Sequence, residues 1–226
     1  MSAPTLARED VDFLSLLSEV NRRRLLEGST RAVFPAGSIA FHPEGPLTSF
    51  LLERGLARAS SSVPDGRQAT VTFFHARDLV GGITLIGRPP RIYVQAVVDS
   101  TMATLDVATA RKLAMTEIEV TIAIATHMAA RIRSSFQLIA VRSLGSIRER
   151  LAYDLLDRAC RTQLVVGRLE VPATHADLAD SIGSSREVVS RALRDLRAAG
   201  IVETTPGMVR VIDPLRVAGI VRAFVI

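Results

Sequence analysis

The sequence predicts an α+β protein: an N-terminal antiparallel β-roll of jelly-roll-like type, a long dimerisation helix and a C-terminal winged helix-turn-helix. Three observations predict this order. Short apolar runs separated by glycine and proline fill residues 32–106, a heptad-spaced apolar seam follows, and a helix, tight turn, helix and hairpin occupy residues 174–213. We therefore divide the chain into residues 1–114, the roll with flanking helices; 115–145, the long helix and hinge; and 146–226, the winged helix-turn-helix.

Composition limits the class of protein further. The chain has 226 residues, of which 48% are hydrophobic, enough for two packed domains. Its net charge of +5 permits a polyanionic partner. The single cysteine, Cys160, rules out an internal disulfide and a metal site built from several thiolates. No signal peptide and no uninterrupted apolar run of about 18 residues is present, so we expect a cytoplasmic protein without a membrane partner.

The N-terminal half contains short helices and then short strands. Apolar residues recur at helical spacing over residues 9–29, which predicts one or two helices. The dipeptide Asp65-Gly66 predicts a hairpin turn. Regularly spaced strands with such turns are typical of an antiparallel barrel or sandwich. The predicted strands are residues 32–34, 38–41, 50–52, 56–59, 69–74, 94–98 and 103–107.

A long helix is predicted from about Met115 to Val141, because this segment has no proline or glycine. Its apolar seam advances in steps of four and three residues, as in a coiled coil, and this favours a homodimer over a packing helix within one domain. The acidic residues Glu117 and Glu119 are expected on its solvated face. A hinge is predicted at Ser143–Gly145, before a helix over residues 146–162. The seam consists of Ile118, Ile122, Ala125, Ala129, Ile132, Phe136 and Ile139.

The terminal module starts with a short strand at residues 169–172 and continues with two helices. Thr174 and Asp177 can form a capping box at the first helix, and Gly183 suits the turn, because glycine adopts a left-handed conformation without strain. Ser184 is expected to cap the second helix, with Glu187 at the capping-box position. Gly200 then ends that helix, and residues 201–204 and 208–212 form the wing.

The second helix carries side chains that suit DNA recognition. Arginine can hydrogen-bond guanine through O6 and N7, and a carboxylate can accept from the cytosine amino group. A solvated helix face with ordinary charges is the alternative, but turn, caps and wing all agree with a helix that enters the major groove of double-stranded DNA. The candidate DNA-binding residues are Ser184, Ser185, Arg186, Glu187, Ser190 and Arg191.

These residues resemble the CRP/FNR family of transcription regulators. GSSREVVSRAL is similar to the family's recognition helix, and FPAGSIAFHPEG, FLLERG, PDGR and RDLVGG resemble the turns of its cyclic-nucleotide-type roll. The resemblance covers nearly the whole chain. It implies a homodimeric, sequence-specific regulator that contacts RNA polymerase and binds a palindrome with half-sites like TGTGA or TTGA. By position, Arg186, Glu187 and Arg191 match the base-reading residues of the cyclic-AMP type, and Glu187, Ser190 and Arg191 those of the FNR type.

The expected effector site departs from the cyclic-AMP pattern. Gly82 follows Gly81 where the family has a glutamate for the ribose hydroxyl, and Ile92 follows Arg91 where it has a serine for the phosphate. On the long helix, Ser135 and Phe136 occupy the adenine-facing positions. A bound nucleotide would therefore be left with unpaired polar groups. The candidate effector residues are Gly81, Gly82, Arg91, Ser135 and Phe136, and we expect an effector other than ordinary cyclic AMP, or none.

Other cofactors and chemistries have little support in the sequence. An iron–sulfur centre needs several cysteines, and a haem would need ligands such as His75 and His127, which are isolated. Cys160 fits a buried apolar position better than a redox switch. No P-loop, nucleophile elbow, zinc motif or dinucleotide fingerprint is present, so we expect no metal and no enzyme. The alternatives are a ligand-binding module whose terminal domain contacts proteins and, last, a barrel enzyme.

Overall fold

The computed structural model describes residues 12–62 and 68–223, and the described part begins with two short helices. A 3-10 helix, η1 (Phe13–Leu16), precedes α1 (Glu19–Leu26). Asp12 caps the first helix and Ser18 the second, each by accepting a hydrogen bond from a free backbone N–H. The prediction of one or two helices over residues 9–29 is confirmed within the described residues.

Within the described residues of this half, eight antiparallel strands form two four-stranded sheets, with the orders β1-β8-β3-β6 and β2-β7-β4-β5. The predicted roll of short strands is confirmed. β4 and β5 pair from Leu56 opposite His75 to Ser62 opposite Gln68, whereas the predicted turn at Asp65-Gly66 lies outside the described residues. The strands are β1 (Thr30–Phe34), β2 (Ile39–Phe41), β3 (Phe50–Arg54), β4 (Leu56–Ser62), β5 (Gln68–His75), β6 (Leu79–Val80), β7 (Tyr93–Ala96) and β8 (Ser100–Thr104).

The last strand of the roll lies earlier than its apolar run suggested. The sequence predicted a strand over residues 103–107, but β8 ends at Thr104 and the next helix begins at Val107. Asp106 explains the boundary, because its carboxylate accepts a hydrogen bond from Thr109 N at 2.6 Å and caps that helix. Apolar runs alone cannot separate a buried strand end from a buried helix start.

Three helices complete the N-terminal half: α2 (Ile83–Ile86), α3 (Val107–Thr116) and the long α4 (Ile118–Leu144). The long helix starts and ends three residues later than predicted. Glu117 has extended backbone angles and separates α3 from α4, whose axes differ by 107°. Within the described part of the chain no single helix is long and apolar enough to cross a membrane, and α3 and α4 would pass only as this bent pair.

Two acidic residues at the start of α4 hold the N-terminal helices in place. Glu119 accepts hydrogen bonds from the backbone and hydroxyl of Ser18 and from the amide of Asn21, and Glu117 pairs with Arg24 at 2.8 Å. The expectation that they form a purely solvated face is wrong, because they join α1 to α4. Hydrogen bonds from Ser18 and Asn21 also lower the pKa of Glu119, so its carboxylate stays ionised.

As far as residue 223, the C-terminal module contains four helices and a small sheet, and the predicted winged helix-turn-helix is confirmed. Ser146 caps the first helix with a complete capping box to Glu149. That helix is longer than predicted and reaches Val166 before Gly167 ends it at φ +70°. The elements are α5 (Ile147–Val166), β9 (Glu170–Pro172), α6 (His175–Ile182), α7 (Arg186–Ala198), β10 (Val202–Thr205), β11 (Met208–Val211) and α8 (Pro214–Arg222).

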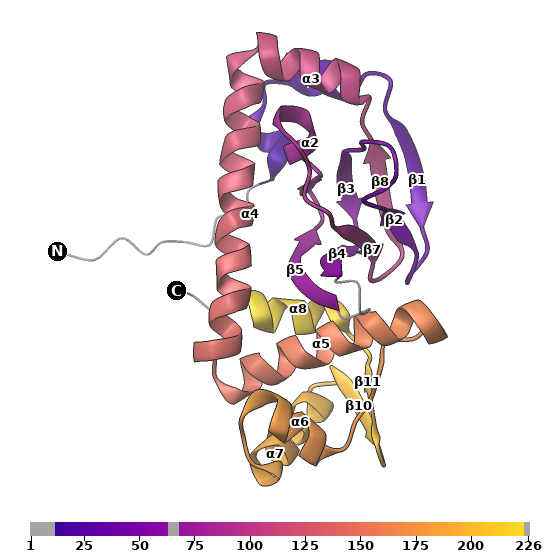
Figure 1. Ribbon diagram of the computed structural model, residues 1–226, viewed down its shortest axis with the longest axis vertical. Coiled ribbons are helices and arrows are strands. Elements are labelled where there is room, and N and C mark those ends of the chain that lie inside the picture. Colours follow the sequence, from indigo (N-terminus) through magenta and orange to yellow (C-terminus); the bar gives the residue numbers. More distant parts are fainter. Residues whose placement is uncertain (1–11, 63–67, 224–226) are drawn as a thin grey trace, which may run out of the picture.

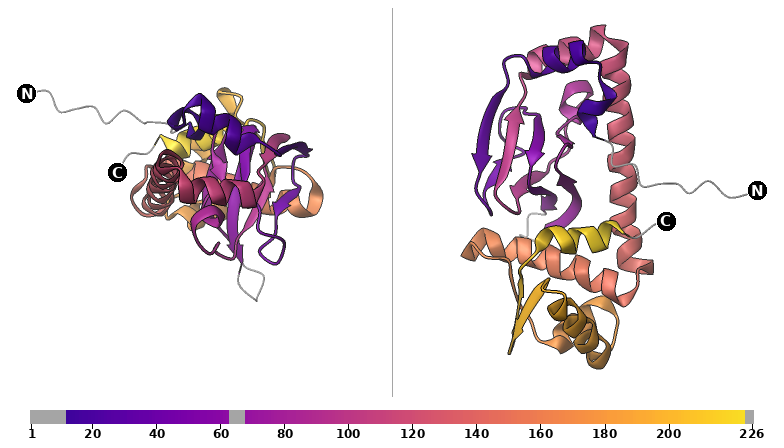
Figure 2. Two further views of the ribbon diagram at one scale, coloured as in Figure 1. Left: turned by 90° about the horizontal axis from the view of Figure 1, so that it is seen from above. Right: turned by 180° about the vertical axis from the view of Figure 1, so that it is seen from behind.

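The helices α4 and α5 organise the molecule. The long α4 runs along the roll, and α5 crosses beneath the roll's lower end with the winged module below it (Figure 1). From behind, α8 lies on α5 between the roll and α4 (Figure 2). One hydrophobic cluster runs from Leu56, Phe73 and Val97 of the roll into α5 and the winged module. The roll and the DNA-binding module therefore share part of their core.

Candidate nucleic-acid interface

The turn between α6 and α7 has the geometry of a helix-turn-helix. Thr174 and Asp177 form the predicted capping box at the start of α6. Gly183 ends α6 in the left-handed region, at φ +61°. Only three residues then separate α6 from α7, a length typical of this motif.

The cap of α7 is one residue later than predicted. Ser185, not Ser184, is the N-cap, and its hydroxyl accepts from Val188 N at 3.4 Å. Ser184 is already engaged, because its N–H donates to Ala179 O at 2.9 Å and closes a Schellman motif at the end of α6. Glu187 therefore does not occupy the capping-box position and remains at the surface in the first turn of α7.

The face of α7 opposite its core is polar and accessible. Val189, Leu193 and Leu196 are buried against α6 and the rest of the module. Ser185, Arg186, Glu187 and Arg191 are exposed, and Ser184 and Ser190 are half-buried. The six predicted contact residues thus gather at the turn and in the first two turns of α7, and their contact with DNA stays a prediction.

Two of these side chains, Glu187 and Ser190, have polar contacts with neighbouring residues of the module. Hydrogen bonds from its own backbone N–H and from Ser185 lower the pKa of Glu187, so this carboxylate is ionised and can accept from a base amino group. The hydroxyl of Ser190 lies 2.8 Å from Nδ1 of His175, the first residue of α6. No role for His175 follows from the sequence, since residues 15 apart on two helices show no spacing signal.

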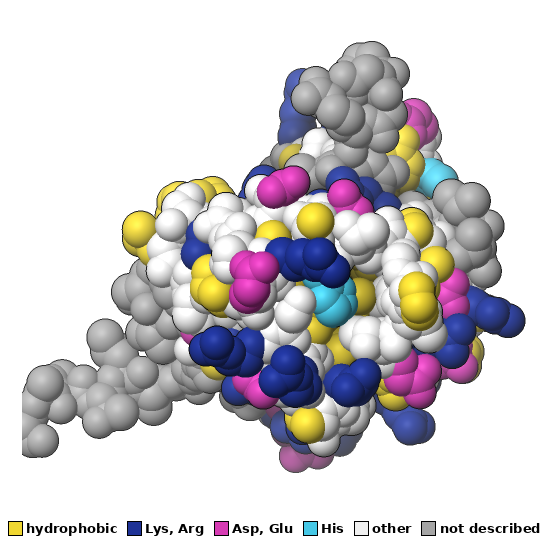
Figure 3. All heavy atoms as spheres, turned by 90° about the horizontal axis from the view of Figure 1, so that it is seen from below, with side chains coloured by type: hydrophobic (Ala, Val, Ile, Leu, Met, Phe, Trp, Pro, Cys, Tyr) yellow, Lys and Arg dark blue, Asp and Glu magenta, His cyan; other side chains and the backbone are white. Residues whose placement is uncertain are grey.

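The wing lies beside this helix. β11 pairs with both β10 and β9, and Gly207 at φ +72° makes the tight connection at the tip. Seen from below, the winged end displays basic side chains around a histidine, with several acidic side chains among them (Figure 3). The exposed arginines of this module include Arg186, Arg191, Arg194, Arg197 and Arg210. Arginines on such a surface are suited to phosphate contacts, which fix the position of a protein on the duplex.

All seven residues of the predicted seam lie on one exposed stripe of α4. The five large members are between 54% and 79% exposed, and Ala125 and Ala129 are exposed between them. The opposite face of α4 is buried against the roll and the N-terminal helices through Val120, Ile124 and His127. An exposed stripe of this length on a folded chain is unusual for a surface that only meets water.

The predicted effector residues do not converge. Gly81 borders a small cavity of about 20 Å³, whose described lining is apolar except for Thr48 and Thr84. A Cβ on Gly82 would lie 2.9 Å from Leu79 Cδ2, so the position has no room for a larger side chain without movement. Arg91 points outward to Glu44, at 2.6 Å.

On α4, the two predicted adenine-facing residues also lie away from that cavity. The hydroxyl of Ser135 donates to Arg131 O one turn earlier, and Phe136 is 57% exposed on the seam. Gly82, Arg91, Ser135 and Phe136 are absent from the described lining of the cavity at Gly81. Their role in effector binding therefore stays a prediction that this geometry does not favour.

A buried polar cluster, not predicted from the sequence, joins the roll to α4. Asp78 pairs with Arg131 at 2.8 Å and lies 3.3 Å from Nε2 of His127. The same His127 nitrogen accepts from Leu79 N at 3.2 Å, and the ring stacks edge-on with Phe13 at 5.7 Å. These contacts give His127 a structural role, and the described residues hold no group of three or more potential metal ligands.

A second buried network joins the roll to α5. Arg58 on β4 is fully buried, and its guanidinium bonds Asp157 at 3.0 Å and the hydroxyl of Thr70 at 2.7 Å. Gln95 on β7 donates to Cys160 O and to Gln163 on α5, at 3.0 and 3.1 Å. Cys160 itself is buried, as expected, and burial raises the pKa of its thiol to about 12.

The same architecture occurs in known regulators. Residues 31–117 match the sequence model of the Cyclic nucleotide-binding domain, and residues 149–218 match that of the Crp-like helix-turn-helix domain. Transcriptional regulator LdrP from Thermus thermophilus is 29% identical over 178 residues, which cover 78% of this chain and 88% of the relative. The cAMP-activated global transcriptional regulator Vfr from Pseudomonas aeruginosa is 23% identical, with 83% of this chain and 87% of the relative covered.

Solved structures share the fold. A protein from Eubacterium rectale, described as a crp/fnr family regulator, superposes with a TM-score of 0.58 at 20% identity, covering 92% of this chain and 96% of its own. The c-di-GMP responsive global regulator CLP from Xanthomonas campestris superposes with a TM-score of 0.54 at 18% identity, covering 86% and 99%. The chain belongs to the CRP/FNR family. It is accordingly a transcription regulator with a DNA-binding helix-turn-helix, and not an enzyme.

Proposed function

We propose that this regulator acts as a homodimer that reads a palindromic DNA site through α7. The observation that carries the proposal is the exposed stripe on α4. Seven apolar residues from Ile118 to Ile139 keep a four-three spacing, and all are exposed in the single chain. A second copy of α4 would cover the stripe by knobs-into-holes packing, and the small Ala125 and Ala129 at its centre allow the two helices to approach closely.

Dimer formation gives the two recognition helices a fixed separation. In a two-fold dimer, two copies of α7 enter successive major grooves about 34 Å apart, so the site is a palindrome. We propose that Arg186 and Arg191 donate to guanine and that Glu187 accepts from cytosine. Ser190, with Thr204 and Thr205 of the wing, suits phosphate contacts. RNA polymerase is a further expected partner by family resemblance, and a DNA-reading role implies action in the cytoplasm.

The signal that controls this regulator is proposed to differ from ordinary cyclic AMP. The cavity at Gly81 has a volume of about 20 Å³, room for roughly one water molecule, and no charged side chain lines it among the described residues. Arg91 is exposed and paired with Glu44. A cyclic nucleotide carries a charged phosphate and several hydroxyl and ring polar groups, which would be left without partners there.

Sedimentation of two seam variants tests the dimer. We expect Ile122→Glu and Phe136→Glu to sediment as monomers at concentrations where the wild type is a dimer, because each places two like charges on an apolar contact. Val33→Glu, which changes an equally exposed valine on β1, is the matched control and should remain dimeric. If the wild type is monomeric, or both seam variants stay dimeric, the proposed interface is wrong.

A further inference from the structure

We propose that the cavity between β5, α4 and α8 binds a small carboxylate anion, and that this site carries the signal to the DNA-binding module. The cavity has a volume of about 30 Å³. It is separate from the cavity at Gly81, because the two share no described lining residue. The inference that binding changes DNA affinity rests on the proposed function, whereas the binding itself does not.

Two hydrogen-bonding atoms in the walls of this cavity lack a partner. The buried Nε of Arg131 and the buried Nε2 of His75 make no hydrogen bond within the described residues. The remaining guanidinium bonds of Arg131 go to Asp78 at 2.8 Å and to Phe73 O at 3.3 Å, which fixes the side chain and leaves Nε available. The Nε of Arg131 is always a donor, and Nε2 of His75 is a donor in one of its two neutral tautomers. A buried donor without a partner is destabilising, so the Arg131 Nε–H favours a ligand that accepts a hydrogen bond, and His75 can join it in that tautomer.

The lining favours an anion with an apolar end. Arg131, Arg222 and the uncharged polar groups Thr72, Ser134 and Gln137 contribute to the described lining, which contains no aspartate or glutamate. The other walls are the buried apolar side chains of Phe73, Leu138, Ala218 and Val221. A volume of 30 Å³ holds about two water molecules, which is the space of the two oxygens of a carboxylate. Because the carboxylate oxygens take up this volume, a short alkyl tail would lie at the open mouth of the cavity, beside the apolar side chains.

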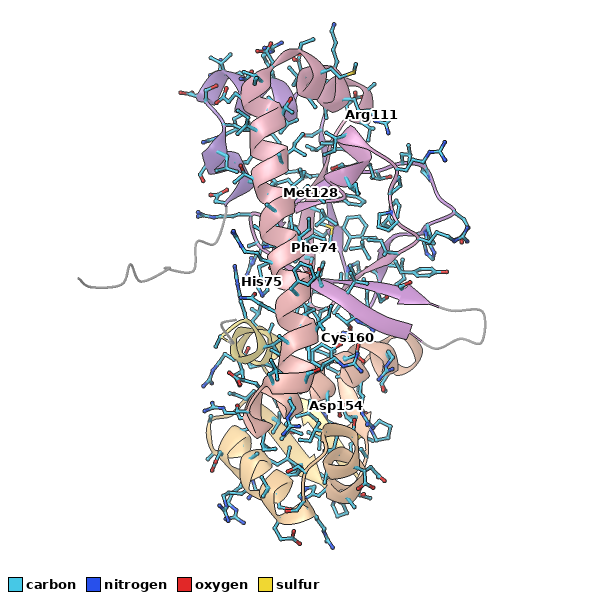
Figure 4. The ribbon with its side chains drawn as sticks, turned by 60° about the vertical axis from the view of Figure 1, so that its left-hand side comes forward. Phe74, His75, Arg111, Met128, Asp154 and Cys160 are labelled. Atoms are coloured by element: carbon cyan, nitrogen blue, oxygen red, sulfur yellow. The ribbon has the colours of Figure 1, made fainter. Side chains whose placement is uncertain are left out.

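The position of the cavity makes it a point of contact among three parts of the molecule. β5 belongs to the roll, α4 carries the predicted dimer seam, and α8 ends the DNA-binding module. Figure 4 shows His75 beside α4 on the side where α8 lies. Because α8 also packs on α5, a ligand that moves α8 away from α4 would change how the winged module is held.

Ligand-observed saturation-transfer NMR tests the site with acetate and butyrate as probes and acetamide as the uncharged analogue of acetate. We expect transfer to both carboxylates and much less to acetamide, because a hydrogen bond from the Nε of Arg131 to a charged carboxylate is stronger than one to a neutral amide oxygen. His75→Phe removes Nε2 and Ala218→Leu fills the cavity, and each should weaken carboxylate binding about tenfold or more. His42→Phe, a histidine of the roll outside the cavity, should bind as the wild type does.

The inference is wrong if neither carboxylate shows transfer with the wild type, which means that only water fills the cavity. It is also wrong if acetamide shows transfer equal to that of the carboxylates, or if both cavity variants bind the carboxylates as the wild type does. Thermal melting of each variant shows that it is folded, and the two variants act by different means, so a misfolded one does not remove the test. DNA affinity with and without butyrate is then measured on a selected site. Carboxylate binding without any change in DNA affinity refutes the coupling, and a wild type that selects no DNA refutes the proposed function instead.

Discussion

Gly145 ends α4 with φ −63° and ψ 153°, angles that any residue adopts, yet an added Cβ would lie 2.5 Å from Val141 O. Glycine is therefore required at this bend because a Cβ would clash with Val141 O, and not because of the backbone angles. We expect Gly145→Ala to lower the free energy of unfolding by about 1–3 kcal/mol, the usual cost of forced overpacking. Gly219 lies within α8 and has open space around it, so Gly219→Ala should raise the free energy of unfolding by about 0.5–1 kcal/mol. Urea denaturation measures both, and equal effects would refute the steric argument.

Arg186 is the side chain on which base reading depends most. We expect Arg186→Ala to weaken binding to a selected site by about 1–3 kcal/mol and to relax the preference at one base pair in each half-site. Fluorescence anisotropy with the selected site and with variants of it measures both effects. Arg23→Ala, an exposed arginine on α1 at the other end of the molecule, is the control and should change neither. A loss that is equal on all sequences would assign Arg186 to phosphate contact instead.

His75 makes stability depend on pH. Burial lowers the pKa of its imidazole below the ordinary value of 6.5, nearby Asp78 opposes this, and Arg131 adds to it. The unfolded chain therefore takes up the proton first, so the stabilisation is complete above pH 6.5 and is lost as the pH falls. We expect His75→Phe to reduce the fall in the free energy of unfolding between pH values on either side of about 6.5. An identical fall in the variant would show that other groups cause it.

At the level of elements, the contact between the roll and α5 depends on a buried ion pair. Asp157 has a second partner, Arg161 at 3.1 Å. Among the described residues, Asp157 is the one acidic side chain that pairs with the fully buried Arg58. Asp157→Ala leaves a buried guanidinium without its countercharge and should cost about 3–5 kcal/mol, whereas Arg58→Met leaves Asp157 paired with Arg161 and should cost less.

Chemical denaturation of these variants and of Arg58→Met combined with Asp157→Ala checks the asymmetry. The double variant should be more stable than Asp157→Ala alone, because the unpaired charge is gone. The proposed role of the pair is wrong if the two single variants lose equal free energy of unfolding. It is also wrong if the loss in the double variant equals the sum of the two single losses.

Local signals in the sequence predicted most elements, because they depend on residues close in the chain. The four-three spacing located α4 to within three residues, and Thr174, Gly183 and Gly200 marked the helix ends of the winged module. The errors also have local causes. Two adjacent serines cannot be ranked as caps without knowing that Ser184 N closes the preceding helix. The helix α3 was missed because its start follows directly on an apolar strand.

At the level of the whole molecule, the sequence did not predict what joins the two halves. Arg58 and Asp157 are 99 residues apart, and Asp78 and Arg131 are 53 apart. Such pairs carry no spacing signal, since the tertiary fold alone brings them together. The predicted effector residues lie apart for the same reason. Gly81 borders the cavity in the roll, Arg91 pairs with Glu44 at the surface, and Phe136 lies on the exposed seam.

We propose above that a homodimer reads a palindrome through α7. Selection of DNA sites from a random pool with the purified full chain tests it most directly, with the Arg186→Ala variant run in parallel. We predict that the wild type enriches a two-fold symmetric site whose half-sites are about one helical turn apart, and that the variant loses preference at symmetric positions of that site. Enrichment of a single, asymmetric half-site, or the same palindrome with unchanged base preference in the variant, would contradict it.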